Sequence, residues 1–148
     1  MDDLAETIKD EATRAFYDYW RGRRRGDDLP LWQDFDPVEM RGWLGSINVI
    51  EVLTETDGHR FRYRVHGDRL SQFLGVEMTG KFADEIPADA VRKRAIAGYN
   101  SVVEGGAPAL VHYDANDAAD RRCTVQRLTV PVLDEDVLLL ISYFRIDP

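Results

Sequence analysis

A small set of ionisable side chains in this sequence could carry out chemistry. His66 precedes Gly67 and is separated from Asp68 by that one residue, and because imidazole titrates near neutrality, such a pair could exchange a proton with a substrate. A histidine at a strand end with a local hydrogen bond is the competing interpretation. The guanidinium of Arg64 could hold a carboxylate or a phosphate if it faces a cavity, or it could form a surface ion pair instead.

Other polar and aromatic residues are candidates to line a ligand pocket. His112 could orient a ligand or occupy an exposed sheet position. Gln126 and Ser142 interrupt apolar strands, and a buried polar group needs a partner, which could be protein or ligand. Tyr99 and Tyr113 offer ring area and a directed hydroxyl, although core filling would also explain them. The candidate pocket set is Tyr63, Arg64, His66, Phe73, Tyr99, His112, Tyr113, Gln126 and Ser142.

Metal and nucleic-acid sites are not expected from the composition. The single cysteine, Cys123, and three scattered histidines give no zinc-ligand spacing, so we predict no metal. With 27 acidic and 19 basic residues, the net charge is -8, which repels a phosphate backbone. The arginines of 21–25 are followed at once by aspartates, which favours a locally paired segment over a nucleic-acid partner.

The hydropathy pattern excludes a membrane span and points to the cytoplasm. The longest apolar run, Val137–Ile141, has five residues, whereas crossing a bilayer takes about 20. The acidic start of the chain lacks the basic and apolar stretches of a secretory signal. We therefore expect a cytoplasmic protein with no membrane partner.

Apolar residues at steps of three and four predict an amphipathic helix from Leu4 to Trp20. Its apolar stripe could form a dimer seam or could pack on the chain's own sheet. After an extended segment, the Asp36-Pro37 step predicts a short helix from Pro37 to Leu44. The candidate dimer residues are Leu4, Ile8, Phe16, Tyr19 and Trp20.

The rest of the chain predicts a sheet with helices inserted between its second and third strands. Asp68 would cap a short helix that ends at Gly75, and a long helix follows at Ala88–Glu104. In the first hairpin we expect Phe61, Tyr63 and Val65 to face the core. The predicted strands are Ile47–Leu53, Phe61–His66, Ala109–Tyr113, Cys123–Val132 and Val137–Phe144. The fold class is therefore α+β, an antiparallel sheet with helices on one face.

Several of these segments resemble a PAS sensor domain. Tyr63–Gly75, followed by Thr79–Lys81 and Asp84–Pro87, is similar to the middle of such a domain, and Val130–Asp134 before the final strand resembles its end. The N-terminal elements Tyr19–Arg23, Leu29-Pro30 and Asp36-Pro37 are similar to a branch of small bacterial PAS proteins with an N-terminal helix. The resemblance covers nearly the whole chain, with one departure: Gly67 stands where many PAS domains have asparagine.

The resemblance implies a five-stranded antiparallel sheet, a pocket between sheet and helices, and dimerisation through the N-terminal helix. Residues 1–46 would be an N-terminal helical extension and cap, and residues 47–148 the PAS-like sensor core. The family's haem ligand usually comes from the long helix, yet 88–104 contains no His, Cys or Met. The cysteine motif of flavin photosensors is also absent. We therefore expect neither haem nor flavin.

Together these observations predict a non-catalytic sensory or signal-relay module. It would bind a small molecule or a signalling protein partner and would form a homodimer. One alternative is a pure dimerisation or protein-interaction module without ligand. Another is a small cone-shaped α+β enzyme whose candidate residues would be His66, His112 and Asp114.

Overall fold

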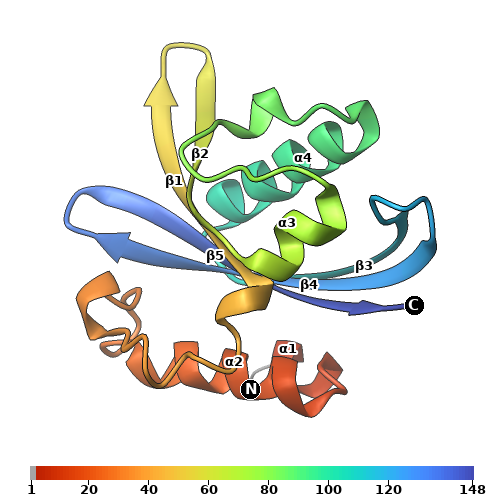
Figure 1. Ribbon diagram of the computed structural model, residues 1–148. Coiled ribbons are helices and arrows are strands. Elements are labelled where there is room, and N and C mark those ends of the chain that lie inside the picture. Colours follow the sequence, from red (N-terminus) through yellow and green to blue (C-terminus); the bar gives the residue numbers. More distant parts are fainter. Residues whose placement is uncertain (1–2) are drawn as a thin grey trace.

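Five antiparallel strands form one sheet in the computed structural model, which describes residues 3–148 (Figure 1). The strands lie in the order β2-β1-β5-β4-β3, so the first hairpin joins the last three strands where β1 pairs with β5. The strands are β1 (Ile47–Glu55), β2 (Gly58–His66), β3 (Ala109–Asn116), β4 (Arg122–Asp134) and β5 (Val137–Asp147). The predicted α+β fold with a five-stranded antiparallel sheet is confirmed.

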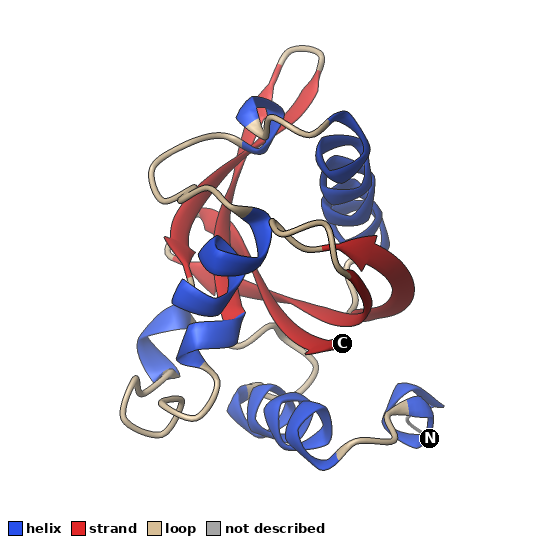
Figure 2. Cartoon of the chain, turned by 45° about the vertical axis from the view of Figure 1, so that its right-hand side comes forward, coloured by secondary structure: helices blue, strands red, loops and turns tan. Residues whose placement is uncertain are grey.

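Helical segments lie on both sides of this sheet (Figures 1 and 2). We name the two sides by their covering helices. The inner face is covered by α3 (Asp68–Leu74), the 3-10 turn η3 (Ala83–Glu85) and α4 (Asp89–Gly105). The outer face is covered by α1 (Asp3–Thr7), α2 (Glu11–Arg23) and the 3-10 turns η1 (Trp32–Asp34) and η2 (Leu44–Ser46).

Each face has its own hydrophobic cluster because successive strand residues point to opposite sides. On β5, Ile141 belongs to the outer cluster and Leu140 to the inner one. The outer cluster joins the N-terminal helices to β1, β4 and β5, whereas the inner cluster joins α4 and η3 to β1 and β2. The central strands are therefore buried on both sides.

The predicted single helix from Leu4 to Trp20 is two helices. α1 ends at Thr7, and α2 begins after Asp10, whose carboxylate accepts a hydrogen bond from the Thr13 N–H at 3.0 Å. Aspartate at this position satisfies an amide at the helix start that would otherwise lack a partner. The local cap overrides the apolar period that runs through the whole segment.

The apolar stripe of this segment is not an exposed dimer seam. Ile8, Phe16 and Trp20 are at most 1% exposed and pack on the outer face of the chain's own sheet, with Leu4 and Tyr19 partly buried at the edge. The Trp20 indole N–H donates to the Pro131 carbonyl at 2.8 Å. Ile8, Phe16 and Trp20 therefore follow the intramolecular alternative, whereas a dimer contact through the partly buried Leu4 and Tyr19 stays a prediction.

The helix expected from Pro37 to Leu44 is also wrong. Residues 37–43 form successive turns, and a single 3-10 turn at Leu44–Ser46 leads into β1. The Asp36 carboxylate accepts the Val38 N–H at 2.9 Å, which closes a local turn in place of a helical cap.

A β-bulge at the end of β2 changes which residues face inward. Val49 pairs with Val65, but Ile50 pairs with Tyr63, so Arg64 is the extra residue. Phe61 and Tyr63 are buried in the inner cluster as predicted. Val65 instead lies on the outer side, 36% exposed, and His66 is buried on the inner side.

The N-cap of α3 is Gly67, not Asp68 as the sequence predicted. A Cβ on Gly67 would lie 2.7 Å from the Leu44 carbonyl oxygen and even closer to the Gly45 backbone. Glycine is therefore required because the outer-face segment passes directly against this junction. The predicted stop at Gly75 is confirmed, since this residue ends α3 with a φ of 81°.

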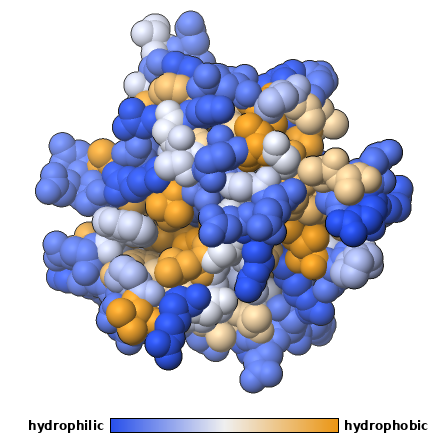
Figure 3. Space-filling model, in the orientation of Figure 1, coloured by the Kyte–Doolittle hydropathy of each residue, from blue (hydrophilic) through white to orange (hydrophobic). Residues whose placement is uncertain are grey.

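The surface in the view of Figure 1 is mainly hydrophilic, with smaller apolar areas among the polar side chains (Figure 3). Among the described residues, the exposed large hydrophobic side chains are Val38, Leu44 and Val65. No helix in the described part of the chain is long and apolar enough to span a membrane.

Candidate functional site

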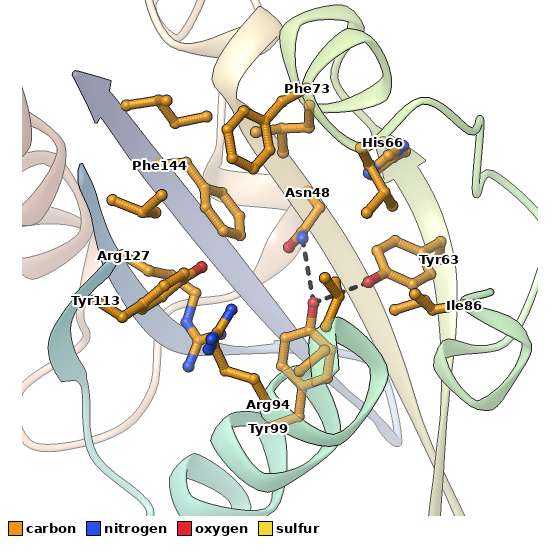
Figure 4. Close-up of a pocket in the computed structure, with 16 residues that line it drawn as sticks. Asn48, Tyr63, His66, Phe73, Ile86, Arg94, Tyr99, Tyr113, Arg127 and Phe144 are labelled. Carbon is orange, nitrogen blue, oxygen red and sulfur yellow. Dashed lines mark hydrogen bonds between the residues drawn. The ribbon is translucent and has the colours of Figure 1, made fainter. Parts of the chain in front are cut away.

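A cavity of about 70 Å³ lies between the inner face and helices α3 and α4 (Figure 4). Its walls are largely aliphatic and aromatic, with a few polar groups that come from the sheet and from α4. The lining side chains belong to Asn48, Tyr63, His66, Leu70, Phe73, Leu74, Ile86, Val91, Arg94, Ala95, Tyr99, Tyr113, Val125, Arg127, Phe144 and Ile146. An apolar cavity with few convergent polar groups is the usual form of a small-molecule site.

Five of the nine predicted pocket residues line this cavity. Tyr63 and His66 come from β2, Phe73 from α3, Tyr99 from α4 and Tyr113 from β3. The structure thus brings together residues from four elements that are far apart in sequence. The other four predicted residues lie elsewhere.

Arg64 lies on the outer side, opposite to Tyr63, as the alternation along β2 predicts. Its guanidinium donates to Glu51 at 2.9 Å and to Asp134 at 2.8 Å. Glu51 also accepts from Arg62 at 2.8 Å, and these contacts hold the pKa of the Glu51 carboxyl below its ordinary value. The ion-pair interpretation of Arg64 is therefore correct, and its assignment to the pocket is wrong.

His112 and Gln126 are paired register partners on the outer face, not pocket residues. The Gln126 amide donates to Asp10 at 2.7 Å and to Thr13 at 2.9 Å, and its oxygen lies 2.7 Å from His112 Nε2. Gln126 therefore ties β4 to the start of α2.

Ser142 is fully buried on β5, but it does not line the cavity. Its hydroxyl is 2.7 Å from the hydroxyl of Thr129 on β4. The buried polar group that the sequence flagged is thus satisfied by protein.

The candidate enzyme residues are separated by the sheet. His66 is on the inner side, whereas His112 contacts Gln126 on the outer side and Asp114, two residues along β3, pairs with Arg122 at 2.8 Å. These three side chains do not converge on one substrate. In residues 3–148, no group of His, Cys, Asp and Glu is arranged to hold a metal ion.

Neighbouring protein groups hold the His66 ring in place. Its Nδ1 accepts from the Met78 N–H at 3.3 Å and lies 2.9 Å from the Ser71 hydroxyl. Burial lowers the pKa of His66, against a smaller opposing effect of Glu77. Because Nδ1 accepts, the neutral ring carries its proton on Nε2. His66 thereby fastens the loop after α3 to the end of β2.

Three buried polar groups meet at the centre of the cavity wall. The Tyr99 hydroxyl receives the Asn48 amide N–H at 3.2 Å and lies 3.2 Å from the Tyr63 hydroxyl (Figure 4). Burial raises the pKa of both tyrosines, so both hydroxyls keep their protons. The Asn48 side-chain oxygen has no partner, although Asn48 is only 2% exposed.

Two arginines that the sequence analysis missed also line the cavity. Arg127 on β4 is 6% exposed, and Arg94 projects from α4. Their guanidinium carbons lie 5.9 and 4.3 Å from the centre of the Tyr113 ring. Gly98 on α4 makes room, because a Cβ there would lie 2.9 Å from Arg127 Cζ and closer still to Nη2. A glycine inside a helix was the available signal for this close approach.

The sequence also matches a known protein family. A family model described as PAS domain matches residues 8–138. No curated protein matches the chain.

Proposed function

We propose a ligand-sensing function on the premise that this chain belongs to the PAS domain family. The family supports a sensory or signalling module in general. We assign the binding step to the inner-face cavity, and we propose that the chain itself catalyses no reaction.

One observation carries this proposal: the cavity wall contains a buried polar atom that no protein atom satisfies. The Asn48 oxygen lacks a hydrogen-bond partner. An unpaired buried polar group costs about 1–3 kcal/mol, and this one lies in the wall of a cavity that a ligand could fill. A bound small molecule that donates to this oxygen would remove the cost.

A wider groove gives this cavity a route to solvent. The groove has a volume of about 480 Å³ and shares Phe73, Phe144 and Ile146 with the cavity. These three side chains border both spaces, so we propose that a ligand enters by displacing them. Phe73 lies on the short helix α3, which can shift with less loss of packing than the central strands.

The size of the cavity limits which ligands and cofactors it could hold. Drug-sized ligands occupy pockets of roughly 300–1,000 Å³, well above the 70 Å³ present here. We therefore propose a small ligand and neither haem nor flavin.

The sheet offers a path from the cavity to the N-terminal helix. Arg127 lines the cavity, and its neighbour Gln126 holds Asp10 and Thr13 at the start of α2. A ligand can switch the module only if it binds two arrangements with different affinity. We propose that these arrangements differ in how β4 and α2 are joined, and that a protein partner reads the change.

Native mass spectrometry of the gently purified full chain tests the binding step. We expect a co-purifying small molecule in the wild type and in Ala97→Leu, whose side chain is exposed on α4. Ala95→Leu, two residues away on α4 and inside the cavity, should lose it. If the wild type carries no small molecule and Ala95→Leu gives the same mass spectrum, the pure interaction module is favoured.

The homodimer expected for this family is a separate proposal. PAS domains commonly dimerise, but the N-terminal stripe is already used inside the chain. Sedimentation equilibrium should give twice the chain mass of 16.9 kDa. A single-chain mass at all concentrations would contradict a dimer without affecting the cavity.

A further inference from the structure

The cavity holds two positive charges and no negative one. Arg94 and Arg127 approach the same Tyr113 ring, and no lining side chain is acidic. Within residues 3–148, neither guanidinium forms an ion pair with a carboxylate. The other arginine of α4, Arg92, and the three arginines of β2 show the contrast, since all four have acidic partners.

Leaving these two charges unpaired is unfavourable for the folded chain. Arg127 is nearly fully buried, and a guanidinium cannot escape by losing its proton. Arg127 also hydrogen-bonds to the Tyr113 side chain, and the ring attracts a cation, but these neutral contacts are weaker than a hydrogen-bonded ion pair. An anion between the two guanidinium groups would supply the missing charge and accept hydrogen bonds from both.

A third group restricts the chemistry of the anion. The Asn48 oxygen is buried in the same cavity and lacks a donor, and in Figure 4 it points away from Tyr99, on the side of Phe144. Phe73, Leu70 and Phe144 supply apolar wall between the polar groups. The ligand therefore needs a negative group, a short apolar body and a hydrogen-bond donor.

We propose that the cavity binds a small hydroxy acid, with its carboxylate on Arg94 and Arg127 and its hydroxyl donating to Asn48. This inference rests on the proposed ligand-sensing function and names the class of ligand. A volume of about 70 Å³ holds about five water molecules at 10–15 Å³ each. A compact acid fits this space, whereas a long acyl chain does not.

Titration of the full chain with lactate, followed by amide NMR shifts, tests the charge requirement. We expect saturable shifts at Asn48, Arg94 and Arg127 with lactate, weaker binding of propionate, which lacks the hydroxyl, and no binding of neutral lactamide. Equal binding of lactate and lactamide would overturn the inference. Tighter binding of inorganic phosphate than of lactate would overturn the choice of a carboxylate.

Charge-removing variants on α4 assign the effect to the cavity. Arg94→Gln should weaken lactate binding by about tenfold or more, the usual effect of losing a charged hydrogen bond. Lys93→Gln removes the same charge from an exposed position paired with Asp89 and should leave the affinity unchanged. Equal weakening by both variants would point to a general charge effect and contradict the site.

Arg127→Met separates ligand binding from a structural role. If the unpaired charge is kept for a ligand, its removal should raise the unfolding temperature of the ligand-free chain by about 2–4 °C and should abolish stabilisation by lactate. A lower unfolding temperature, with lactate stabilisation intact, would show that Arg127 serves only the fold.

If no acid binds while native mass spectrometry finds a neutral ligand, this inference fails and the proposed function stands.

Discussion

The two faces of the sheet use the same strands for different purposes. On the outer face, Phe16 and Trp20 fill the space against β4 and β5, and the Trp20 N–H has a partner. On the inner face, Arg94 and Arg127 have no carboxylate, and Asn48 has an unpaired oxygen. The outer cluster is thus filled by side chains, whereas the inner face holds a cavity with charged and polar groups, which we propose to be kept for a ligand.

Strand β4 shows how closely the two roles are interleaved. Leu128 and Val130 point into the outer cluster, whereas Val125 and Arg127 line the cavity. Gln126 lies between the cavity residues in sequence but contacts α2. A movement of two neighbouring residues on β4 would therefore alter side-chain contacts on both faces.

The largest expected effect comes from truncating the filled outer core. Phe16→Ala removes a fully buried ring and should lower the free energy of unfolding by about 3–5 kcal/mol. Phe73→Ala, a half-buried ring beside the cavity, should lower it by only about 1–2 kcal/mol. Urea unfolding measures both, and equal losses would contradict the difference between the faces.

A smaller loss is expected where the two faces meet, at Gly67. Gly67→Ala would drive a methyl group into the backbone at Leu44 and Gly45, which should cost about 1–3 kcal/mol. Gly22→Ala is the matched control, because a Cβ at this helical position meets nothing within 4 Å and alanine favours a helix. Urea unfolding should show a loss for the first and no loss for the second. A harmless Gly67→Ala would show that this junction is not tight.

The pH dependence of stability should report the buried histidine of the inner face. Because burial lowers the pKa of His66 below its ordinary 6.5, the unfolded chain takes up a proton at a higher pH than the folded chain does. Stability is therefore full above about pH 6.5 and falls as the pH drops from there to the lower folded-state value.

His66→Gln should flatten this part of the stability curve in chemical denaturation at several pH values, whereas His59→Gln should not. A second decline in stability with falling pH is expected from Glu77, whose pKa is lowered from 4.5 to about 2 by hydrogen bonds from Thr79 and Ser71. It should appear only below pH 4.5. An unchanged slope in His66→Gln would contradict the role given to this residue.

The smallest effect on stability is expected for Gly98→Ala. Alanine is favoured in a helix by about 1 kcal/mol, but its methyl group must displace the end of the Arg127 side chain. The two effects oppose each other, so the free energy of unfolding should change by less than about 1 kcal/mol. Lactate affinity, measured by the same NMR titration, should nevertheless fall. An unchanged affinity would place Arg127 outside the binding site.

Much of the fold follows from local sequence signals. The alternation in β2, the helical spacing from Ala88 and the glycines after both inner helices located the elements to within a few residues. The break at Asp10 was missed because one capping side chain decided it against a continuous apolar period.

The site was harder to predict because it depends on which side each residue faces. The bulge at Arg64 reverses the alternation for Val65 and His66, and no local pattern marks it. Gln126 lies on a strand buried on both sides, where apolar residues point both ways. Arg94 was missed because a charged side chain on a helix is most simply exposed to solvent, and only Gly98 marked the approach of Arg127.

The relay from inner to outer face is tested most directly by hydrogen exchange at the amides of α2, with and without saturating lactate. We predict that lactate changes protection at the start of α2, near Asp10 and Thr13, and that Gln126→Leu, which removes the link from β4, abolishes this change while lactate still binds. Unchanged protection in the wild type at saturating lactate would contradict the account.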